Sequence, residues 1–419
     1  MEFVKVQRRV QRHDDHRVRD TDSAIRPFTG QRPSRDEQRP RRVALVASSY
    51  NYIKDGVALT LNRLVEYLER QGVEVLVFAP VAKSPAFAHH GTLVPVPSLP
   101  LPPRPEYRVA FGLQRQAVDR LRAFRPDIIH IALAPDFLGY SVLKVAQKMR
   151  VPVVASYHTR FETYLKHYWY VAGFTGVVRC YLRHVYGACR EVYVPSQSIV
   201  DALLADGFRN NFRLWPRGVD TSLFNPNKRS SAWRAKNGIG ESEFVVTFVS
   251  RLVREKRLDI LVAALLLMEA RGVVHRSVIV GDGPERAALE RQLPGAVFTG
   301  FEEGEELARA YASSDVFLFP SETETFGNVT LEAMASGLPC VCADATGSRS
   351  LVVHGCTGYL AKPGCAPEFA DNVAALACDP QLRQRMGAAA RERSLGFSWD
   401  ETMACILGYY KSLLAGTLS

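Results

Sequence analysis

Short apolar runs alternate with amphipathic stretches along the chain from about residue 42 onward, and the alternation occurs in two successive series. This pattern is typical of strand–helix–strand units, which build parallel sheets. The strands predicted for the first series cover 43–47, 73–78, 127–133, 152–157, 191–194 and 212–215. Those of the second cover 244–250, 277–280, 297–299, 316–319, 340–343 and 358–361. The chain is therefore predicted to have an α/β fold with two doubly wound sheets.

The segments between the strands fit this prediction. Residues 56–72 carry apolar side chains at helical spacing and end at a glycine, which is typical of a packed helix. These side chains are Val57, Leu61, Leu64, Val65 and Leu68. The segment 84–105 is rich in proline and interrupts the alternation. We expect it to form a surface excursion around one short edge strand.

A chain of 419 residues is too long for one core of ordinary size, which favours two domains. A polar stretch without strand signals, 220–243, separates the two series and predicts a hinge. We expect a basic arm over 1–41, an N-terminal domain over 42–216 and a C-terminal domain over 217–397. The remainder, 398–419, is predicted to be a helix that packs back on the N-terminal domain.

The composition, with 47% hydrophobic and 23% charged residues, is that of a protein with a proper core. The longest apolar stretch, 258–268, is shorter than the roughly 20 residues that cross a bilayer. The first residues include arginines but no apolar segment typical of a secretory signal, which indicates a cytoplasmic location. The eight cysteines form no CxxC pair, and we expect most to be buried in a reducing compartment.

The formal net charge of +10 indicates an anionic partner: nucleic acid, an anionic membrane surface or a phosphorylated substrate. Part of this charge comes from eleven arginines within 1–42, where large apolar residues are few. We expect this segment to be a disordered, solvated arm.

The stretch 321–339 is the most informative part of the sequence. It follows a predicted strand and opens a helix next to a glycine, Gly327. Unpaired N–H groups at such a helix start favour a diphosphate. Glu324 before the helix and Glu332 within it can then hold hydroxyls on either side of the phosphates. The alternative from physics alone is an ordinary helix with an acidic start.

The spacing of Glu324 and Glu332, with Thr-Phe-Gly-Asn between them, resembles the donor-site signature of glycosyltransferase family 4, and the resemblance covers nearly all of 42–415. It implies the GT-B fold, in which two Rossmann-like domains face a central cleft. It also implies retaining transfer of a hexose from a nucleotide diphosphate sugar. Glu324 would contact the sugar catalytically and Glu332 the ribose. The other residues implied in donor binding at this helix start are Thr325, Phe326, Gly327, Asn328 and Val329.

Further matches follow in order. Arg251 and Lys256, at the end of the strand 244–250, resemble the family's clamp on the diphosphate, where fixed cations stabilise the leaving charge. Taken alone, such a pair is usually solvated surface, but ligands of these sheets bind at strand carboxyl ends.

The turn 281–284, Gly-Asp-Gly-Pro, resembles the family's turn of that sequence and includes Gly281, and Phe301 falls in the loop implied to hold the base. Gly56 resembles the glycine that approaches the donor phosphates, and His158 falls where the family has an active-site histidine. The turn lacks the full pattern of a nicotinamide site.

No carboxylate pair is arranged as nucleophile and acid/base. This suits the front-face mechanism usually proposed for retaining members of the fold, in which the donor phosphate helps to deprotonate the acceptor. We expect neither a cofactor nor a metal ion, because the Asp-x-Asp at 20–22 lies in the arm and fixed cations can hold the diphosphate.

Aromatic and basic residues mix in the stretch 160–184, including Arg160, Tyr164, Lys166 and Trp169. The mixture suits the headgroup layer of an anionic membrane, and a partly buried helix is the alternative. Nucleic acid is disfavoured, because no recognised binding module accompanies the bases.

Within the family, His158-Thr159 and the run 215–220 look most like bacterial glycolipid mannosyltransferases and the sulfoquinovosyl or glucosyl transferases of diacylglycerol. This implies GDP-mannose or a UDP-sugar as donor and a lipid acceptor on the inner face of the cytoplasmic membrane. The alternatives are a GT-B nucleotide-sugar epimerase, a soluble or polysaccharide acceptor, and a binding protein without catalysis.

Overall fold

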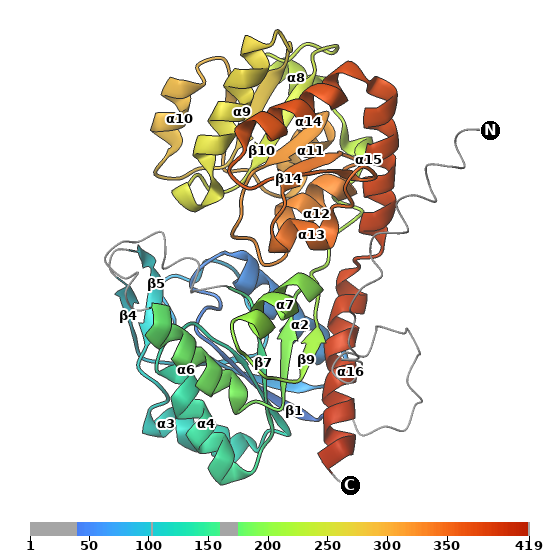
Figure 1. The fold of residues 1–419 in the computed structure, drawn as a ribbon. Coiled ribbons are helices and arrows are strands. Elements are labelled where there is room, and N and C mark those ends of the chain that lie inside the picture. The colour runs from blue at the N-terminus through green and yellow to red at the C-terminus, as the bar shows by residue number, and fades with distance from the viewer. Residues whose placement is uncertain (1–39, 102–103, 160–174, 418–419) are drawn as a thin grey trace, which may run out of the picture. The chain divides into compact units, whose positions relative to one another are not determined.

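The computed structural model describes residues 40–101, 104–159 and 175–417. Two parallel sheets with helices around them follow one another along the chain (Figure 1). The predicted fold of two doubly wound α/β domains is therefore confirmed.

The first sheet has seven strands in the order β3-β2-β1-β6-β7-β8-β9, all parallel. They are β1 (Arg42–Ala47), β2 (Glu74–Ala79), β3 (Thr92–Pro95), β6 (Ile128–Ala132), β7 (Val153–Ser156), β8 (Glu191–Val194) and β9 (Phe212–Leu214). Its helices are α2 (Gly56–Arg70), α3 (Arg115–Phe124), α4 (Leu138–Met149), α6 (Thr175–Gly187) and α7 (Gln197–Ala205). The six predicted strands all occur, and β3 is the edge strand of the proline-rich excursion.

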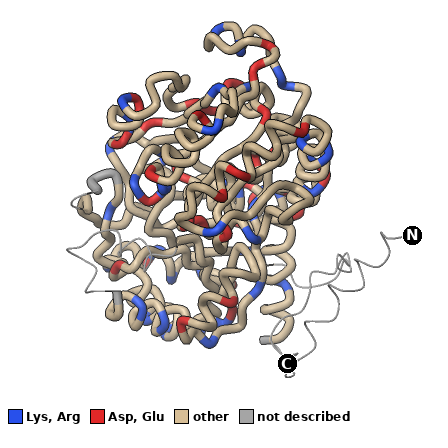
Figure 2. The backbone as a smooth tube through the Cα atoms, turned by 45° about the horizontal axis from the view of Figure 1, so that its top comes forward, with Lys and Arg blue, Asp and Glu red and all other residues tan. Residues whose placement is uncertain are grey.

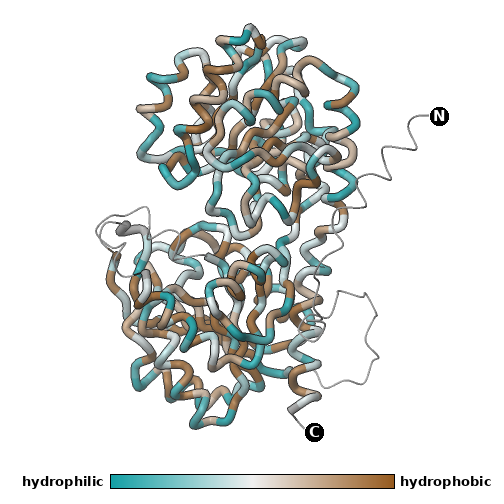
Figure 3. The backbone as a smooth tube through the Cα atoms, in the orientation of Figure 1, coloured by the Kyte–Doolittle hydropathy of each residue, from teal (hydrophilic) through white to brown (hydrophobic). Residues whose placement is uncertain are grey.

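Both faces of this sheet are covered. Ala44 and Val46 of β1 pack into one apolar cluster, whereas Val43 and Leu45 pack into another. Burial on both faces explains why the strands read as continuous apolar runs without alternation. Figure 3 shows hydrophobic stretches running along these strands.

The excursion is more regular than predicted. Its second half forms an antiparallel pair of its own, β4 (Ser98–Leu101) with β5 (Arg104–Ala110). The Arg108 side chain ties the pair together by donating to the side-chain and backbone oxygens of Ser98 at 2.8 and 3.0 Å. Proline argues against a central strand but can be accommodated in an isolated pair. The prolines of this segment therefore kept its strands from being predicted.

The second sheet has six parallel strands in the order β12-β11-β10-β13-β14-β15. They are β10 (Val245–Val249), β11 (Arg276–Val280), β12 (Val297–Gly300), β13 (Val316–Phe319), β14 (Cys340–Ala343) and β15 (Gly358–Ala361). The elements around it are η2 (Pro226–Lys228), α8 (Ser231–Lys236), η3 (Arg254–Lys256), α9 (Leu258–Ala270), α10 (Arg286–Gln292), α11 (Gly304–Ala312), α12 (Asn328–Ala335), α13 (Thr346–Leu351), α14 (Ala366–Cys378) and α15 (Pro380–Leu395). One apolar cluster, containing the stacked rings of Phe317 and Phe319, fills its interior.

The last helix, α16 (Trp399–Thr417), packs on the first sheet. Its Met403, Ile406 and Tyr410 belong to the apolar cluster that also holds Val43 and Leu45. The chain thus crosses between the sheets twice, and the two crossings touch at a parallel bridge from Val219 to Ser398.

Among the described residues, no helix is both long and apolar enough to cross a membrane. Lys and Arg are interspersed with Asp and Glu over the described chain (Figure 2). The expectation that most cysteines are buried is wrong: Cys180, Cys356 and Cys378 are exposed, and Cys365 and Cys405 are only partly buried. Small side chains carry too weak a burial signal to be placed from sequence.

The buried hydroxyl of Tyr410 lies 2.6 Å from Nδ1 of His130, which is itself fully buried in β6. Tyr410→Phe should lower the free energy of unfolding by about 1–3 kcal/mol, because a buried nitrogen loses its partner. The matched control is Tyr409→Phe, since Tyr409 is only partly buried and donates to the Leu214 carbonyl at 2.9 Å. Denaturant unfolding measures both, and equal losses would contradict the importance of the buried pair.

Candidate active site

The predicted site residues of the second sheet follow the carboxyl ends of neighbouring strands. Arg251 and Lys256 follow β10, Gly281 follows β11, and Glu324 follows β13. Because β11, β10 and β13 are adjacent and parallel, their loops meet at one edge. The doubly wound fold binds its ligands at this edge.

Lys256 forms an ion pair with Glu324, and both side chains are less than one fifth exposed. The Ser321 hydroxyl donates to the same Glu324 oxygen at 3.1 Å. Next in the chain, Arg257 pairs with Glu322. The loop after β10 and the loop after β13 are therefore held together by two ion pairs, and Glu324 has a fixed orientation before any ligand arrives.

The turn 281–284 supports the loop that carries Arg251. A Cβ on Gly281, whose φ is +132°, would lie 1.9 Å from the Ser250 carbonyl oxygen, and one on Gly283 would lie 2.3 Å from that of Leu252. The Leu252 N–H donates to the Asp282 carbonyl at 2.9 Å. These glycines are needed because two backbones pack against each other. Arg251 itself is exposed. Burial raises the pKa of Asp55, and hydrogen bonds from the N–H groups of Ala58 and Val57, followed by the charge of Arg251, offset part of this increase.

Helix α12 begins with its N–H groups directed at the site. Its N-cap is Gly327, with φ +101°, so no side chain caps the helix. The backbone N–H groups of the first turn, which includes Asn328 and Val329, have no partner within the helix and suit an anion. The ring of Phe326 is buried and packs edge-on against Phe397, and this contact anchors the loop before α12.

Glu324 is held from a second side. The Thr346 hydroxyl donates to the Glu324 carbonyl at 3.0 Å, and a Cβ on Gly347 would lie 2.5 Å from the Glu324 Cβ. Thr325 donates through its hydroxyl to the His158 carbonyl at 2.8 Å. A Cβ on Gly56 would lie 3.2 Å from the side-chain nitrogen Nδ2 of Asn328, so the start of α2 lies beside the start of α12.

Glu332, one turn into α12, has few polar neighbours. The Tyr311 hydroxyl lies 3.3 Å from it. Burial raises the pKa of Glu332 to about 7, and the bond from Tyr311 and the charge of Arg63 offset only part of this. A carboxylate in such surroundings gains from any hydroxyl that a ligand brings to it.

His158 follows β7, as predicted, and both of its ring nitrogens have partners. Nε2 lies 2.7 Å from the Ser156 hydroxyl and Nδ1 lies 2.5 Å from Nη2 of Arg217. The ring packs edge-on against Trp215. Burial, and then the charge of Arg217, hold the pKa of His158 well below its ordinary value. Sequence reasoning missed Ser156 and Arg217, although Arg217 lies in the run 215–220 that carried the resemblance.

The remaining predicted residues are less engaged. Phe301 is 69% exposed after β12. Arg160, Tyr164, Lys166 and Trp169 lie outside the described residues. Of the nearby bases that the structure describes, Arg179 pairs with Asp206 at 3.6 Å and Arg183 donates to the Asp206 carbonyl. Across the described chain, no three His, Cys, Asp or Glu side chains gather as metal ligands.

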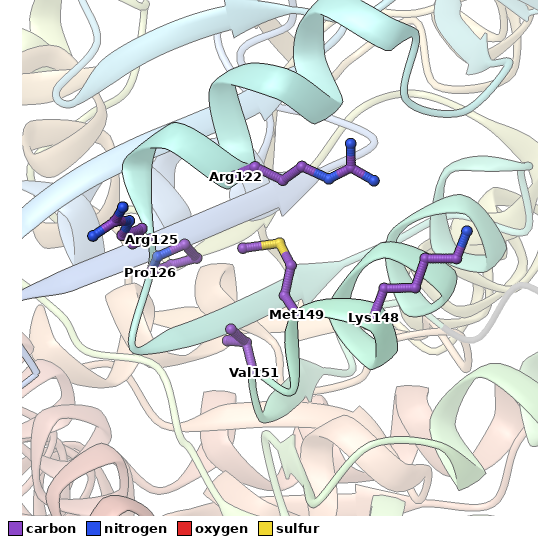
Figure 4. Close-up of a pocket in the computed structure, with 6 residues that line it drawn as sticks. All are labelled: Arg122, Arg125, Pro126, Lys148, Met149 and Val151. Atoms are coloured by element: carbon purple, nitrogen blue, oxygen red, sulfur yellow. The ribbon is translucent and has the colours of Figure 1, made fainter.

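A cavity of about 410 Å³ opens elsewhere, between the ends of α3 and α4 (Figure 4). Its lining consists of Arg122, Arg125, Pro126, Lys148, Met149 and Val151. Pro126 and Val151 precede β6 and β7, so the cavity lies at the amino ends of the strands, away from the edge described above. Its cations suit the negative ends of α3 and α4.

The raised pKa of Glu332 makes stability depend on pH. The folded value, about 7, exceeds the ordinary value of 4.5, so the folded protein binds the proton more tightly. Between these values the free energy of unfolding should fall as pH rises, by at most about 3 kcal/mol. Glu332→Gln should therefore be more stable than wild type at pH 8 and similar to it at pH 4.5.

Denaturant unfolding at the two pH values checks this. The control is Glu303→Gln, at a side chain that is 57% exposed, where no such pH-dependent gain is expected. A gain of the same size at both pH values would show that charge burial is not its cause.

Two family descriptions match the chain: Glycosyltransferase Family 4 over residues 54–223 and Glycosyl transferases group 1 over residues 229–393. The chain is 37% identical over 381 residues to a GDP-mannose-dependent alpha-mannosyltransferase of Mycobacterium tuberculosis, covering 89% of this chain and 97% of the relative. It is 35% identical over 375 residues to the sulfoquinovosyl transferase SQD2 of Arabidopsis thaliana, covering 86% and 71%.

Among solved structures, a sucrose-phosphate synthase of Thermosynechococcus elongatus has a similar fold, with a TM-score of 0.73 at 21% identity over 90% of this chain and all of that one. Anabaena HepE in complex with UDP and glucose gives 0.69 at 22%, over 89% and 100%. Together with the parallel sheets and the loops at their carboxyl ends, these matches show that the chain belongs to the GT-B glycosyltransferases of family 4.

Proposed function

We propose that this glycosyltransferase moves a hexose, with retention of configuration, from GDP-mannose or a UDP-sugar to a lipid acceptor in the membrane. Binding of the nucleotide-sugar donor is supported by the start of α12, which no side chain caps, beside the pair of Lys256 and Glu324. The acceptor half rests on the relatives and on an exposed apolar surface of the N-terminal domain.

The donor diphosphate would lie at the start of α12, near Arg251 and Lys256. Lys256 would leave Glu324 for a phosphate oxygen, which frees the Glu324 carboxylate for the sugar hydroxyls. Glu332 would accept from the ribose. Charge that develops on the departing diphosphate is then stabilised by cations and backbone donors that are already in place.

In the proposed transfer, the bond from the sugar C1 to the phosphate oxygen breaks and a bond from C1 to the acceptor oxygen forms on the same face. The acceptor's proton passes to an oxygen of the departing phosphate. His158 and Glu324 line the reacting sugar in this proposal, and no protein carboxylate is needed as nucleophile.

The two glutamates should differ in their kinetic effect. Glu332→Ala should weaken donor binding, because it removes a charged hydrogen bond worth about 1.5–3 kcal/mol. Glu324→Ala should mainly lower kcat, because the Glu324 carboxylate, once Lys256 has left it, would contact the reacting sugar. Steady-state kinetics and thermal shifts with GDP-mannose and with UDP-glucose measure both effects. Glu285→Ala is the control, since Glu285 pairs with the exposed Arg254.

Normal kinetics in both variants would contradict the assigned site. A donor that is converted to another nucleotide sugar, with no acceptor present, would favour the epimerase alternative.

Some relatives bear names that include diacylglycerol, a membrane lipid. One of them, an alpha-monoglucosyldiacylglycerol synthase of Acholeplasma laidlawii, is 27% identical over 319 residues, 72% of this chain. These names support a glycolipid acceptor, and mannosyl transfer is supported in the same way.

Exposed apolar side chains lie on neighbouring segments of the N-terminal domain, and this set is here called the apolar surface. Its members are Leu99, Phe111, Phe137, Tyr140 and Val177, each between 47% and 66% exposed. Backbone hydrogen bonds join their segments: Phe111 donates to Pro97 at 3.2 Å and Phe137 to Ala110 at 3.3 Å.

Bases border the apolar surface. The Lys144 ammonium lies 4.4 Å from the centre of the Tyr140 ring, and His184 packs near the same ring. Aromatic rings beside cations suit the headgroup layer of a membrane. The apolar surface therefore supports a peripheral position on an anionic bilayer.

Changing Phe111 and Phe137 together to Ser should release the protein from vesicles that contain anionic lipid and diacylglycerol, and should lower transfer to the lipid. The control is Val274→Ser, because Val274 is 87% exposed but belongs to the C-terminal domain. Co-sedimentation at low and high salt measures binding. Equal pelleting of the double variant and the control would contradict docking through the apolar surface, and transfer to soluble sugars alone would contradict the lipid acceptor.

A further inference from the structure

Arg217 is an unusual arginine. It lies just after β9 and is 5% exposed. Within the described residues, its only side-chain hydrogen bond goes to Nδ1 of His158 at 2.5 Å. Its guanidinium carbon lies 5.1 Å from the centre of the Trp215 ring. Its Nη1 is buried without a hydrogen-bond partner in the described part of the chain. Burial lowers the pKa of Arg217 to about 10, so it remains a cation at neutral pH.

The contact with Arg217 determines the state of His158. A guanidinium has only donors, so Nδ1 of His158 must be the acceptor and carry no proton. An imidazole whose Nδ1 carries no proton is neutral when its single proton is on Nε2. The Nε2–H then donates to the Ser156 hydroxyl, which lies 2.7 Å away.

We propose that Arg217 is a positioning residue of the transfer reaction, which holds His158 as the neutral tautomer protonated on Nε2. In this state the His158 side chain donates a hydrogen bond and has no free lone pair, so it cannot take the acceptor's proton. The proposal rests on the proposed function, in which that proton passes to the departing phosphate. It assigns His158 a donor's role toward Ser156 or a substrate oxygen.

The surroundings of His158 agree with a neutral ring. The described charged or titratable groups that act on it are Arg217 and His130, and both disfavour a second proton. From the C-terminal domain, Thr325 contacts only the backbone carbonyl of His158. Glu324, which precedes Thr325, is already paired with Lys256.

Nitrogen NMR of the ligand-free full chain, labelled with ¹⁵N in histidine, reads the tautomer directly. The His158 signals are assigned by their loss in His158→Gln. We expect an unprotonated Nδ1 and a protonated Nε2 in wild type and in Arg217→Lys, because lysine is also only a donor. Arg217→Met should populate the other tautomer or the doubly protonated ring. A proton on Nδ1 in wild type, or an unchanged tautomer in Arg217→Met, would overturn the proposal.

Kinetics supply the second readout. Arg217→Met should lower kcat about tenfold or more while the KM for the donor stays within about twofold, and Arg217→Lys should recover part of the loss. Removing the cation raises the pKa of His158, so the acid limb of the kcat profile should move to higher pH in Arg217→Met. Unchanged kcat and pH profile in a folded Arg217→Met would also overturn the proposal.

Folding is monitored by circular dichroism and by the thermal shift with donor. If Arg217→Met does not fold, Ser156→Ala is measured in its place. Ser156→Ala leaves the contact between Arg217 and Nδ1 intact, so the proton should remain on Nε2. A move of the proton to Nδ1 would refute the role of Arg217. The NMR result is obtained without substrate. It therefore does not depend on which donor and acceptor the protein uses. If the proposed function is wrong but the role of Arg217 is right, transfer will be absent while His158 still carries its proton on Nε2.

Discussion

Both faces of each sheet are covered, so the strands are built mainly of apolar side chains, and the rest of the molecule follows from this constraint. Strands such as β6 and β13 are buried along their whole length, with helices on both faces. Groups that bind or react must then sit where the strands end. Parallel pairing brings those ends to one edge, so residues far apart in sequence, such as Lys256 and Glu324, form one cluster.

At that edge, glycine decides how closely the loops approach. The turn at Gly281 and Gly283 lies directly on the backbone after β10, and Gly347 lies on the backbone of Glu324. Each contact would place an added Cβ within 2.5 Å of a neighbouring atom. These glycines do not need to touch a ligand to matter, because they fix the loops that carry Arg251 and Glu324.

Most of the architecture could be predicted from sequence. Long buried runs with turn residues between them identify strands, and all twelve predicted strands occur within a residue or two of their expected bounds. The pair β4 and β5 was missed because prolines mask short exposed strands. The loops that carry Glu324 and Lys256 could be predicted as donor-binding loops, because the spacing of Glu324 from Glu332 and of Arg251 from Lys256 resembles the family's motifs.

Arg217 and Ser156 were not predicted as site residues, since a single arginine or serine gives no local signal. Their importance arises only from the position of the His158 ring between them. The tautomer of a histidine depends on what its neighbours can donate, and that information exists only in three dimensions. The state of Glu332 is similar: its spacing from Glu324 is visible in sequence, but the burial that raises its pKa is not.

The meeting of Val219 with Ser398 has a further consequence. Because α16 completes the core under β1 and α2, the segment between these two residues is topologically an insertion into the N-terminal domain. Its entry and exit lie side by side, held by the bond from the Val219 N–H to the Phe397 carbonyl at 2.9 Å and by the lack of a side chain at Gly218, where a Cβ would meet the Trp399 backbone at 2.6 Å. Two covalent connections that meet at one point restrict the inserted domain more than a single flexible linker would. We therefore expect any motion of this domain to be a rotation about that point, in which the donor loops keep their places relative to one another.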